Sequence, residues 1–93
     1  MATTGPIRRT VMIVDPMGLH VRPAAAFANL AKTSRSKITV WNAEKRADGK
    51  SAMDLIMLIA EKGTEIVVEI DGDDAVVAID PLLAILATPG YED

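Results

Sequence analysis

The segment TEIVVEI at residues 64–70 constrains the fold of this chain more than any other feature. Branched apolar residues alternate there with residues that include two glutamates. A period of two residues is typical of a strand with one buried face and one face in water. We expect Ile66, Val68 and Ile70 to face the core. Glu65, Val67 and Glu69 are expected to face solvent. The other elements are therefore expected on one side of a sheet.

Three further segments are predicted to be strands. Residues 8–14 alternate in the same way after a leader of residues 1–7, and KITVWN at residues 37–42 alternates again. The polar AEKR that follows, residues 43–46, favours a turn into a short strand, so we expect a hairpin.

Two segments have the spacing of helices that pack on a sheet. Residues 23–32 begin with a proline, which is tolerated in a first turn, and then present one apolar face. A second helix is predicted to begin after Ser51 and to end at Gly63, because glycine is a favoured terminator.

A third helix is predicted to follow the turn and capping residues DGDD and to extend to Leu86. Pro81 lies inside it and removes one helical hydrogen bond, at a cost of about 3 kcal/mol in a helix interior. We therefore expect a kink or a break near Asp80, and residues 88–93 are expected to form a tail.

The order of these elements is strand, helix, strand, strand, helix, strand, helix. A chain of 93 residues is long enough for one core, so we treat residues 1–93 as a single domain. Consecutive antiparallel strands with the helices on one face make an open-faced α+β sandwich.

Composition and charge exclude several kinds of site. The chain has no cysteine and a single histidine, so we expect no metal site and no cofactor. A net charge of −3 speaks against nucleic acid as the main partner. No apolar run approaches the roughly 18 residues of a membrane span, so we expect no membrane insertion and a cytoplasmic location.

The single histidine, His20, lies at a predicted boundary between a strand and a helix, in DPMGLHVRPAAAF. A lone histidine is more often structural than reactive. If the helix begins directly after it, however, the N–H groups of Val21 and Arg22 point out of a first turn that favours an anion. The Arg22 guanidinium is matched to phosphate oxygens, and a neutral imidazole is a competent nucleophile. This combination predicts a phosphoryl-binding site.

Two segments of the chain resemble one family. GLHVRPAAAF, residues 18–27, is similar to the active-site signature of HPr, the histidine-containing phosphocarrier of the bacterial phosphoenolpyruvate-dependent sugar phosphotransferase system. DGKSAMDLIMLIAEKGTEI, residues 48–66, resembles the regulatory-serine segment of that family, at the same separation from His20. The resemblance implies a four-stranded antiparallel sheet with three helices on one face, in the order βαββαβα.

The resemblance also implies roles for individual residues. His20 would accept a phosphoryl group at Nδ1 from phosphorylated enzyme I and pass it to an acceptor such as an IIA domain. Arg22 and the backbone N–H groups of Val21 and Arg22 would hold the phosphoryl oxygens. The protein would be a monomer and a carrier more than a turnover enzyme.

Ser51 has two compatible interpretations. Ser51 followed by Asp54 matches a capping pattern before an apolar run, so the hydroxyl is predicted to cap the second helix. The resemblance adds phosphorylation of Ser51 by HPr kinase/phosphorylase, and a phosphate at a helix start is favoured by the helix dipole.

The second predicted helix has more apolar residues than one buried face can hold. Exposed methionine suits contacts with several partners, and in the HPr family the surface around the histidine and this helix contacts both donors and acceptors. By resemblance, this docking surface consists of Met17, Ala52, Met53 and Ile56. Burial is expected for Leu55, Leu58 and Ile59.

Two alternative functions stay open. One is a regulatory binding module with the same fold, although such a module has no need of His20 and Arg22. The other is a carrier of a nitrogen-related phosphotransferase branch, which this sequence does not separate from the sugar branch.

Overall fold

The computed structural model describes residues 5–89, and the parts of the predicted leader and tail at residues 1–4 and 90–93 lie outside the described residues. Within residues 5–89, strands and helices follow one another in the predicted order. The elements are β1 (Ile7–Met12), α1 (Val21–Ala31), β2 (Lys37–Asn42), β3 (Lys45–Asp48), α2 (Ala52–Met57), β4 (Glu65–Asp71) and α3 (Ala75–Leu86).

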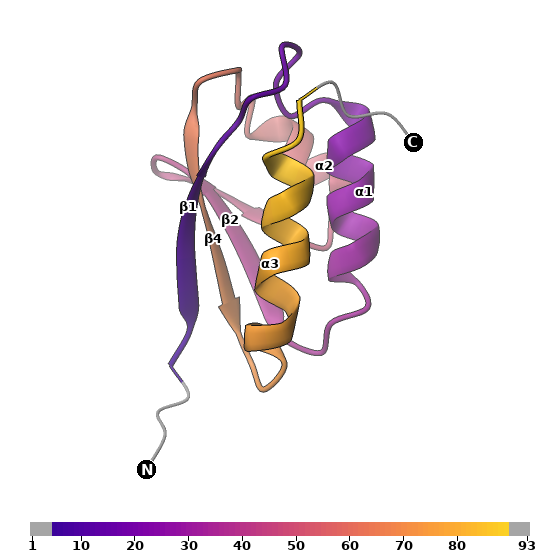
Figure 1. Cartoon of the computed structure of the whole chain (residues 1–93), viewed down its shortest axis with the longest axis vertical. Helices are drawn as coiled ribbons and strands as arrows, with labels where there is room; N and C mark the ends of the chain where they lie inside the picture. The colour runs from indigo at the N-terminus through magenta and orange to yellow at the C-terminus, as the bar shows by residue number, and fades with distance from the viewer. Residues whose placement is uncertain (1–4, 90–93) are drawn as a thin grey trace.

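The strands form one antiparallel sheet in the order β1-β4-β2-β3. β4 is central, and its Val68 lies opposite Arg9 of β1 on one side and Val40 of β2 on the other. The inward residues predicted for this strand, Ile66, Val68 and Ile70, are completely buried. All three helices cover the same face of the sheet (Figure 1). The predicted open-faced α+β sandwich is therefore confirmed.

The core lies between the sheet and the helices. Phe27 of α1 is completely buried. It lies on the same face of the helix as three buried alanines at helical spacing, Ala24, Ala28 and Ala31. α3 contributes Ile79, Leu82 and Leu86 to the same core. Burying one large apolar side chain contributes roughly 1.5–3 kcal/mol, so these residues hold α1 and α3 against the sheet.

Asp74 joins the start of α3 to the segment between α1 and β2. Its carboxylate does not cap its own helix; it accepts hydrogen bonds from the hydroxyls of Ser36 and Ser34, the latter at 2.8 Å, and from the backbone N–H of Arg35 at 3.0 Å. Hydrogen bonds to the ionised form, first from Ser36 and then from Ser34, lower the pKa of Asp74 from 3.8 to about 2.

The bounds of β1 and α1 differ from the predicted bounds by one or two residues. β1 begins at Ile7, which the sequence assigned to the leader, and ends at Met12. α1 begins at Val21, two residues before the proline that was expected to open it. Pro23 therefore occupies the first turn, where its missing N–H breaks no helical hydrogen bond.

The prediction that the second helix extends to Gly63 is wrong. α2 ends at Met57, and the N–H groups of Leu58 and Ile59 then bond to carbonyls three residues back, the tighter turn with which helices often finish. Ile59 adopts a left-handed conformation, with φ of 52°, and its side chain is 64% exposed. The predicted burial of Ile59 is therefore also wrong, whereas Leu55 and Leu58 are buried as expected.

Of the two outcomes predicted near Asp80, a kink or a break, the break is wrong, because α3 continues through Pro81 to Leu86. A proline at this position leaves the carbonyl of Val77 without its helical donor. Both Val77 and Pro81 lie on the exposed side of the helix, where water can bind a carbonyl that tilts outward. The helix therefore tolerates the proline.

Candidate functional site

A tight loop connects β1 to α1 and positions the histidine. The N–H of Gly18 donates to the carbonyl of Asp15 at 2.8 Å, which closes a turn with Pro16 at its second position. Leu19 then donates its N–H to the carbonyl of Ala60, also at 2.8 Å. The loop is thus attached to the segment that follows α2.

His20 is the N-cap of α1, and its side chain makes no capping hydrogen bond to the first turn. The first N–H groups of a helix have no acceptor within the helix, and the first turn of α1 contains no acidic residue that would repel an anion. The imidazole is partly exposed, so it can be approached from solvent. The structure therefore places His20 directly before a helix start, as the site prediction requires.

Asp15 holds one edge of the imidazole. Its Oδ2 lies 3.3 Å from Nε2 of His20, and its Oδ1 accepts the N–H of Met17 at 2.8 Å. Asp15 is only 4% exposed. Asp15 was not among the site residues predicted from the sequence, although an aspartate before a proline after a strand is typical of a turn whose side chain bonds to the backbone.

Arg22 and Val21 lie in the first turn of α1, and both side chains are exposed. The second predicted phosphorylation position, Ser51, is the N-cap of α2 and accepts the N–H of Asp54 on its hydroxyl at 3.1 Å. The predicted capping role of Ser51 is therefore confirmed. The carboxylate of Asp54 accepts the backbone N–H of Asp48 instead of closing a reciprocal capping box.

The residues of the predicted docking surface differ in exposure. Met17 is 75% exposed and Met53 is 70% exposed, whereas Ala52 and Ile56 are partly buried against the core. α2 lies beside α1 at the end of the molecule where α1 begins (Figure 1). Sequence reasoning missed other exposed apolar residues nearby: Val21 in α1, Met57 in α2 and Ile59 just after α2.

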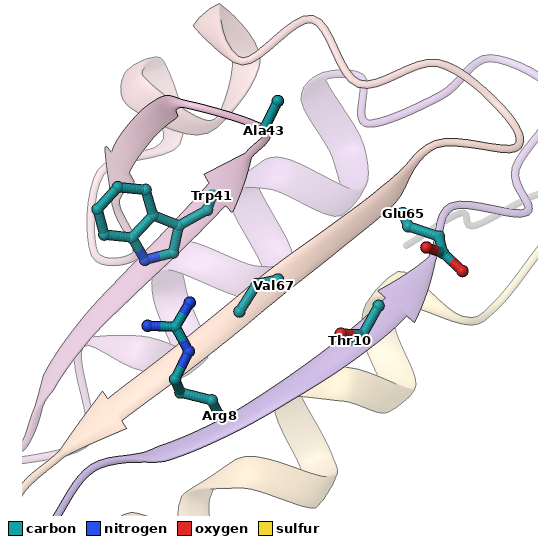
Figure 2. Close-up of a pocket in the computed structure, with 6 residues that line it drawn as sticks. All are labelled: Arg8, Thr10, Trp41, Ala43, Glu65 and Val67. Carbon is teal, nitrogen blue, oxygen red and sulfur yellow. The ribbon is translucent and has the colours of Figure 1, made fainter.

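A cavity of about 340 Å³ lies elsewhere, on the face of the sheet opposite the helices. Figure 2 shows the side chains that line it, which come from β1, β4, β2 and the turn after β2. The guanidinium of Arg46 lies 5.8 Å from the ring centre of Trp41 at this face, a cation–π contact. The cavity includes none of the predicted site residues.

Among residues 5–89, no group of three histidine, cysteine, aspartate or glutamate side chains is arranged to hold a metal ion. No helix in this described part of the chain is long and apolar enough to span a membrane.

Comparison with known sequences points to one family. The family model for the PTS HPr component phosphorylation site matches residues 7–88. The phosphocarrier protein HPr of Haemophilus influenzae is 39% identical over 80 residues, which cover 86% of this chain and 94% of the relative. The phosphocarrier protein NPr of Proteus mirabilis is 35% identical over 86 residues, which cover 91% of this chain and 96% of the relative.

The fold agrees with that of solved relatives. The crystal structure of the phosphocarrier protein HPr from Bacillus anthracis matches with a TM-score of 0.81 at 28% identity, covering 87% of this chain and 96% of that one. A histidine-containing phosphocarrier protein from Mycoplasma matches with a TM-score of 0.82 at 35% identity, covering 85% and 90%. This chain therefore belongs to the HPr family of phosphocarrier proteins of the phosphotransferase system.

Proposed function

We propose that His20 accepts a phosphoryl group from phosphorylated enzyme I on Nδ1 and passes it to IIA-type domains for sugar uptake. One observation carries the choice of atom. Nε2 of His20 lies 3.3 Å from the buried carboxylate of Asp15, so Nδ1 is the ring nitrogen left for phosphorus.

The start of α1 supports this role electrostatically. The backbone N–H groups of Val21 and Arg22 belong to a first turn whose dipole favours negative charge. Pro23 supplies no N–H, so these two groups are the donors that the first turn can offer beside His20. The Arg22 guanidinium adds charge-assisted donors that match the geometry of phosphoryl oxygens. These donors would stabilise the negative charge on the oxygens during transfer.

The transfer needs no base on this chain. The lone pair of Nδ1 attacks phosphorus while the bond between phosphorus and the donor's leaving atom breaks. In the second step a cysteine or histidine side chain of the acceptor attacks the same phosphorus, and the Nδ1–P bond breaks. Both steps use one exposed position, which two partners approach in turn.

We assign the docking surface to Met17, Ala52, Met53 and Ile56. The strong exposure of Met17 and Met53 supports this assignment, because flexible thioether side chains adapt to partners of different shape. Ala52 and Ile56 would contribute smaller contact areas, since both are partly buried.

We further propose that Ser51 is a regulatory phosphorylation site for an HPr kinase/phosphorylase. A phosphate on Ser51 would stand at the start of α2, within reach of the Asp54 N–H that the hydroxyl now binds. It would add about −2 of charge close to the docking surface, which would repel an acidic partner.

The carrier function is tested by incubation with phosphoenolpyruvate and enzyme I, followed by mass measurement at alkaline and acid pH. The wild-type protein is expected to gain one phosphoryl group that acid removes, and His20→Ala is expected to gain none. Equal labelling of the two proteins would refute the assignment. For Ser51, incubation with ATP and the kinase is expected to add an acid-stable phosphate that Ser51→Ala lacks.

The similarity to an NPr protein favours one second candidate, a carrier of a nitrogen-related phosphotransferase branch. The chemistry at His20 would be the same, and only the donor and the acceptors would differ. Transfer rates from the enzymes I of the two branches, measured side by side, distinguish them. A higher kcat/KM with the nitrogen-branch enzyme would favour the second candidate.

A further inference from the structure

We infer that Asp15 is a positioning residue, which holds the His20 imidazole in the tautomer with the proton on Nε2 and the lone pair on Nδ1. This inference rests on the proposed carrier function of His20. It adds a residue outside the helix start to the machinery that makes Nδ1 reactive.

Asp15 is held in place by its own turn. One carboxylate oxygen, Oδ1, accepts the Met17 N–H at 2.8 Å, and the Asp15 carbonyl accepts the Gly18 N–H at 2.8 Å. The residue is 4% exposed, so burial also restricts its movement. Oδ2 is thereby directed at Nε2 of His20, 3.3 Å away.

This arrangement selects one tautomer. A carboxylate only accepts hydrogen bonds, and a neutral imidazole carries a proton on one nitrogen and a lone pair on the other. The contact between Asp15 and His20 is therefore satisfied when Nε2 carries the proton and donates it. Nδ1 then has the lone pair that the attack on phosphorus requires.

The same carboxylate would stabilise the product of the first step. When Nδ1 bonds to phosphorus and Nε2 keeps its proton, the ring gains one positive charge, and the electron pair of the broken bond leaves with the donor. Asp15 places a negative charge beside that ring. When the Nδ1–P bond breaks, its electron pair returns to Nδ1 and the ring is neutral again. No proton moves in either step.

Asp15→Asn tests the inference directly, because asparagine keeps the shape of the side chain but replaces one accepting carboxylate oxygen with a donating amide nitrogen. The Met17 N–H binds the side-chain oxygen that faces it, so the amide nitrogen of asparagine would face His20. An amide nitrogen only donates, and Nε2 would then have to accept. The proton would move to Nδ1 and block the nucleophile. Asp15→Ala removes the carboxylate from Nε2 and leaves the tautomer to the intrinsic preference of the ring.

The experiment measures the His20 tautomer by two-bond ¹H–¹⁵N correlation in ¹⁵N-labelled protein at about pH 8.5, above the ordinary titration range of imidazole. The wild type is expected to show mainly the Nε2–H form, and Asp15→Asn mainly the Nδ1–H form, with Asp15→Ala between them. Phosphoryl transfer from enzyme I is expected to fall about tenfold or more in Asp15→Asn, the effect of a wrong tautomer on a nucleophilic site.

A wild-type protein in the Nδ1–H form would overturn the inference, as would an Asp15→Asn variant with unchanged tautomer and transfer rate. If Asp15→Asn does not fold, the wild type and Asp15→Ala still decide the question through their tautomers. If the wild type accepts no phosphoryl group from enzyme I, the proposed function fails, whereas the tautomer measurement still tests the pairing of Asp15 with His20.

Discussion

Gly18 packs so closely against the carbonyl of Ala60 that it has no room for a side chain. A Cβ on Gly18 would lie 2.5 Å from that oxygen, and the residue has a φ of +72°. We predict that Gly18→Ala destabilises the protein by at least about 2 kcal/mol, from the left-handed conformation and the forced backbone shift together. Urea denaturation measures this loss, and transfer from enzyme I is expected to slow because the loop carries His20.

Gly63→Ala is the matched control for Gly18→Ala. Gly63 also has a positive φ, +88°, but a Cβ there would meet nothing within 4 Å. The free energy of unfolding of this variant should fall by only about 1 kcal/mol, the cost of a left-handed conformation for alanine, and its transfer rate should be unchanged. Equal losses of stability in the two variants would show that the contact with Ala60 is unimportant.

Ser51→Ala is predicted to lower the free energy of unfolding by about 1 kcal/mol, the usual effect of removing a helix N-cap. The reason is the lost hydrogen bond from the Asp54 N–H to the Ser51 hydroxyl at 3.1 Å. Ser51→Asp should keep most of the stability, because aspartate is an equally good cap. Thr33→Ala is the control, since it removes an exposed hydroxyl that binds a carbonyl and caps no helix start. A loss as large in Thr33→Ala would contradict the capping role.

The stability of the protein should depend on the ionisation of Asp74. Folding lowers the pKa of Asp74 to about 2, so this carboxylate binds a proton at higher pH in the unfolded protein than in the folded protein. The contribution of Asp74 is therefore fully present above about pH 5 and is lost as the pH falls from about 4 to about 2. Thermal unfolding of wild type and Asp74→Asn should converge over this range.

Asp73→Asn provides the comparison for Asp74→Asn. Asp73 is strongly exposed, and its carboxylate forms an ion pair at 3.5 Å with the exposed Arg35. Exposed pairs of this kind contribute little to stability. The Asp73 variant should follow the wild type at every pH, and a divergence as large as that of Asp74→Asn would contradict the specific role of Asp74.

Pro81→Ala is predicted to stabilise the protein by about 1–2 kcal/mol, because alanine restores the N–H that the Val77 carbonyl lacks and is a far better helix former. Part of this gain is offset by the greater freedom of the unfolded chain without a proline. Chemical denaturation measures the change, with Asp80→Ala as a neighbouring exposed control. No gain in Pro81→Ala would mean that the helix has already adjusted to the proline at no cost.

The elements that the sequence predicted well are those whose burial pattern is local. β4 alternates between core and solvent, so its period of two residues was visible directly. The early end of α2 was not, because Ile59 is left-handed next to Ala60, whose carbonyl binds Leu19 from a distant part of the chain. α3 has exposed valines, so its apolar residues did not show which side Pro81 occupies.

The site was predicted in part for the same reason. His20 and the two residues after it occupy one helix start, a local feature that turn and helix signals reveal. The approach of the Asp15 carboxylate to the imidazole depends on the shape of the turn between them. Sequence spacing does not specify that shape, so the role proposed for Asp15 could not be predicted from the sequence.

The proposed docking surface leads to the last prediction, the variant Met53→Gln. Met53 is 70% exposed, so a polar side chain of similar length should leave stability unchanged while removing an apolar contact with enzyme I. We expect the KM for transfer from enzyme I to rise about fivefold to thirtyfold, the range of a moderate interface hot spot, with little change in kcat. Val76→Gln on α3 is the matched control, since Val76 is equally exposed but lies on another helix. An unchanged KM in Met53→Gln, or an equal rise in Val76→Gln, would remove Met53 from the interface.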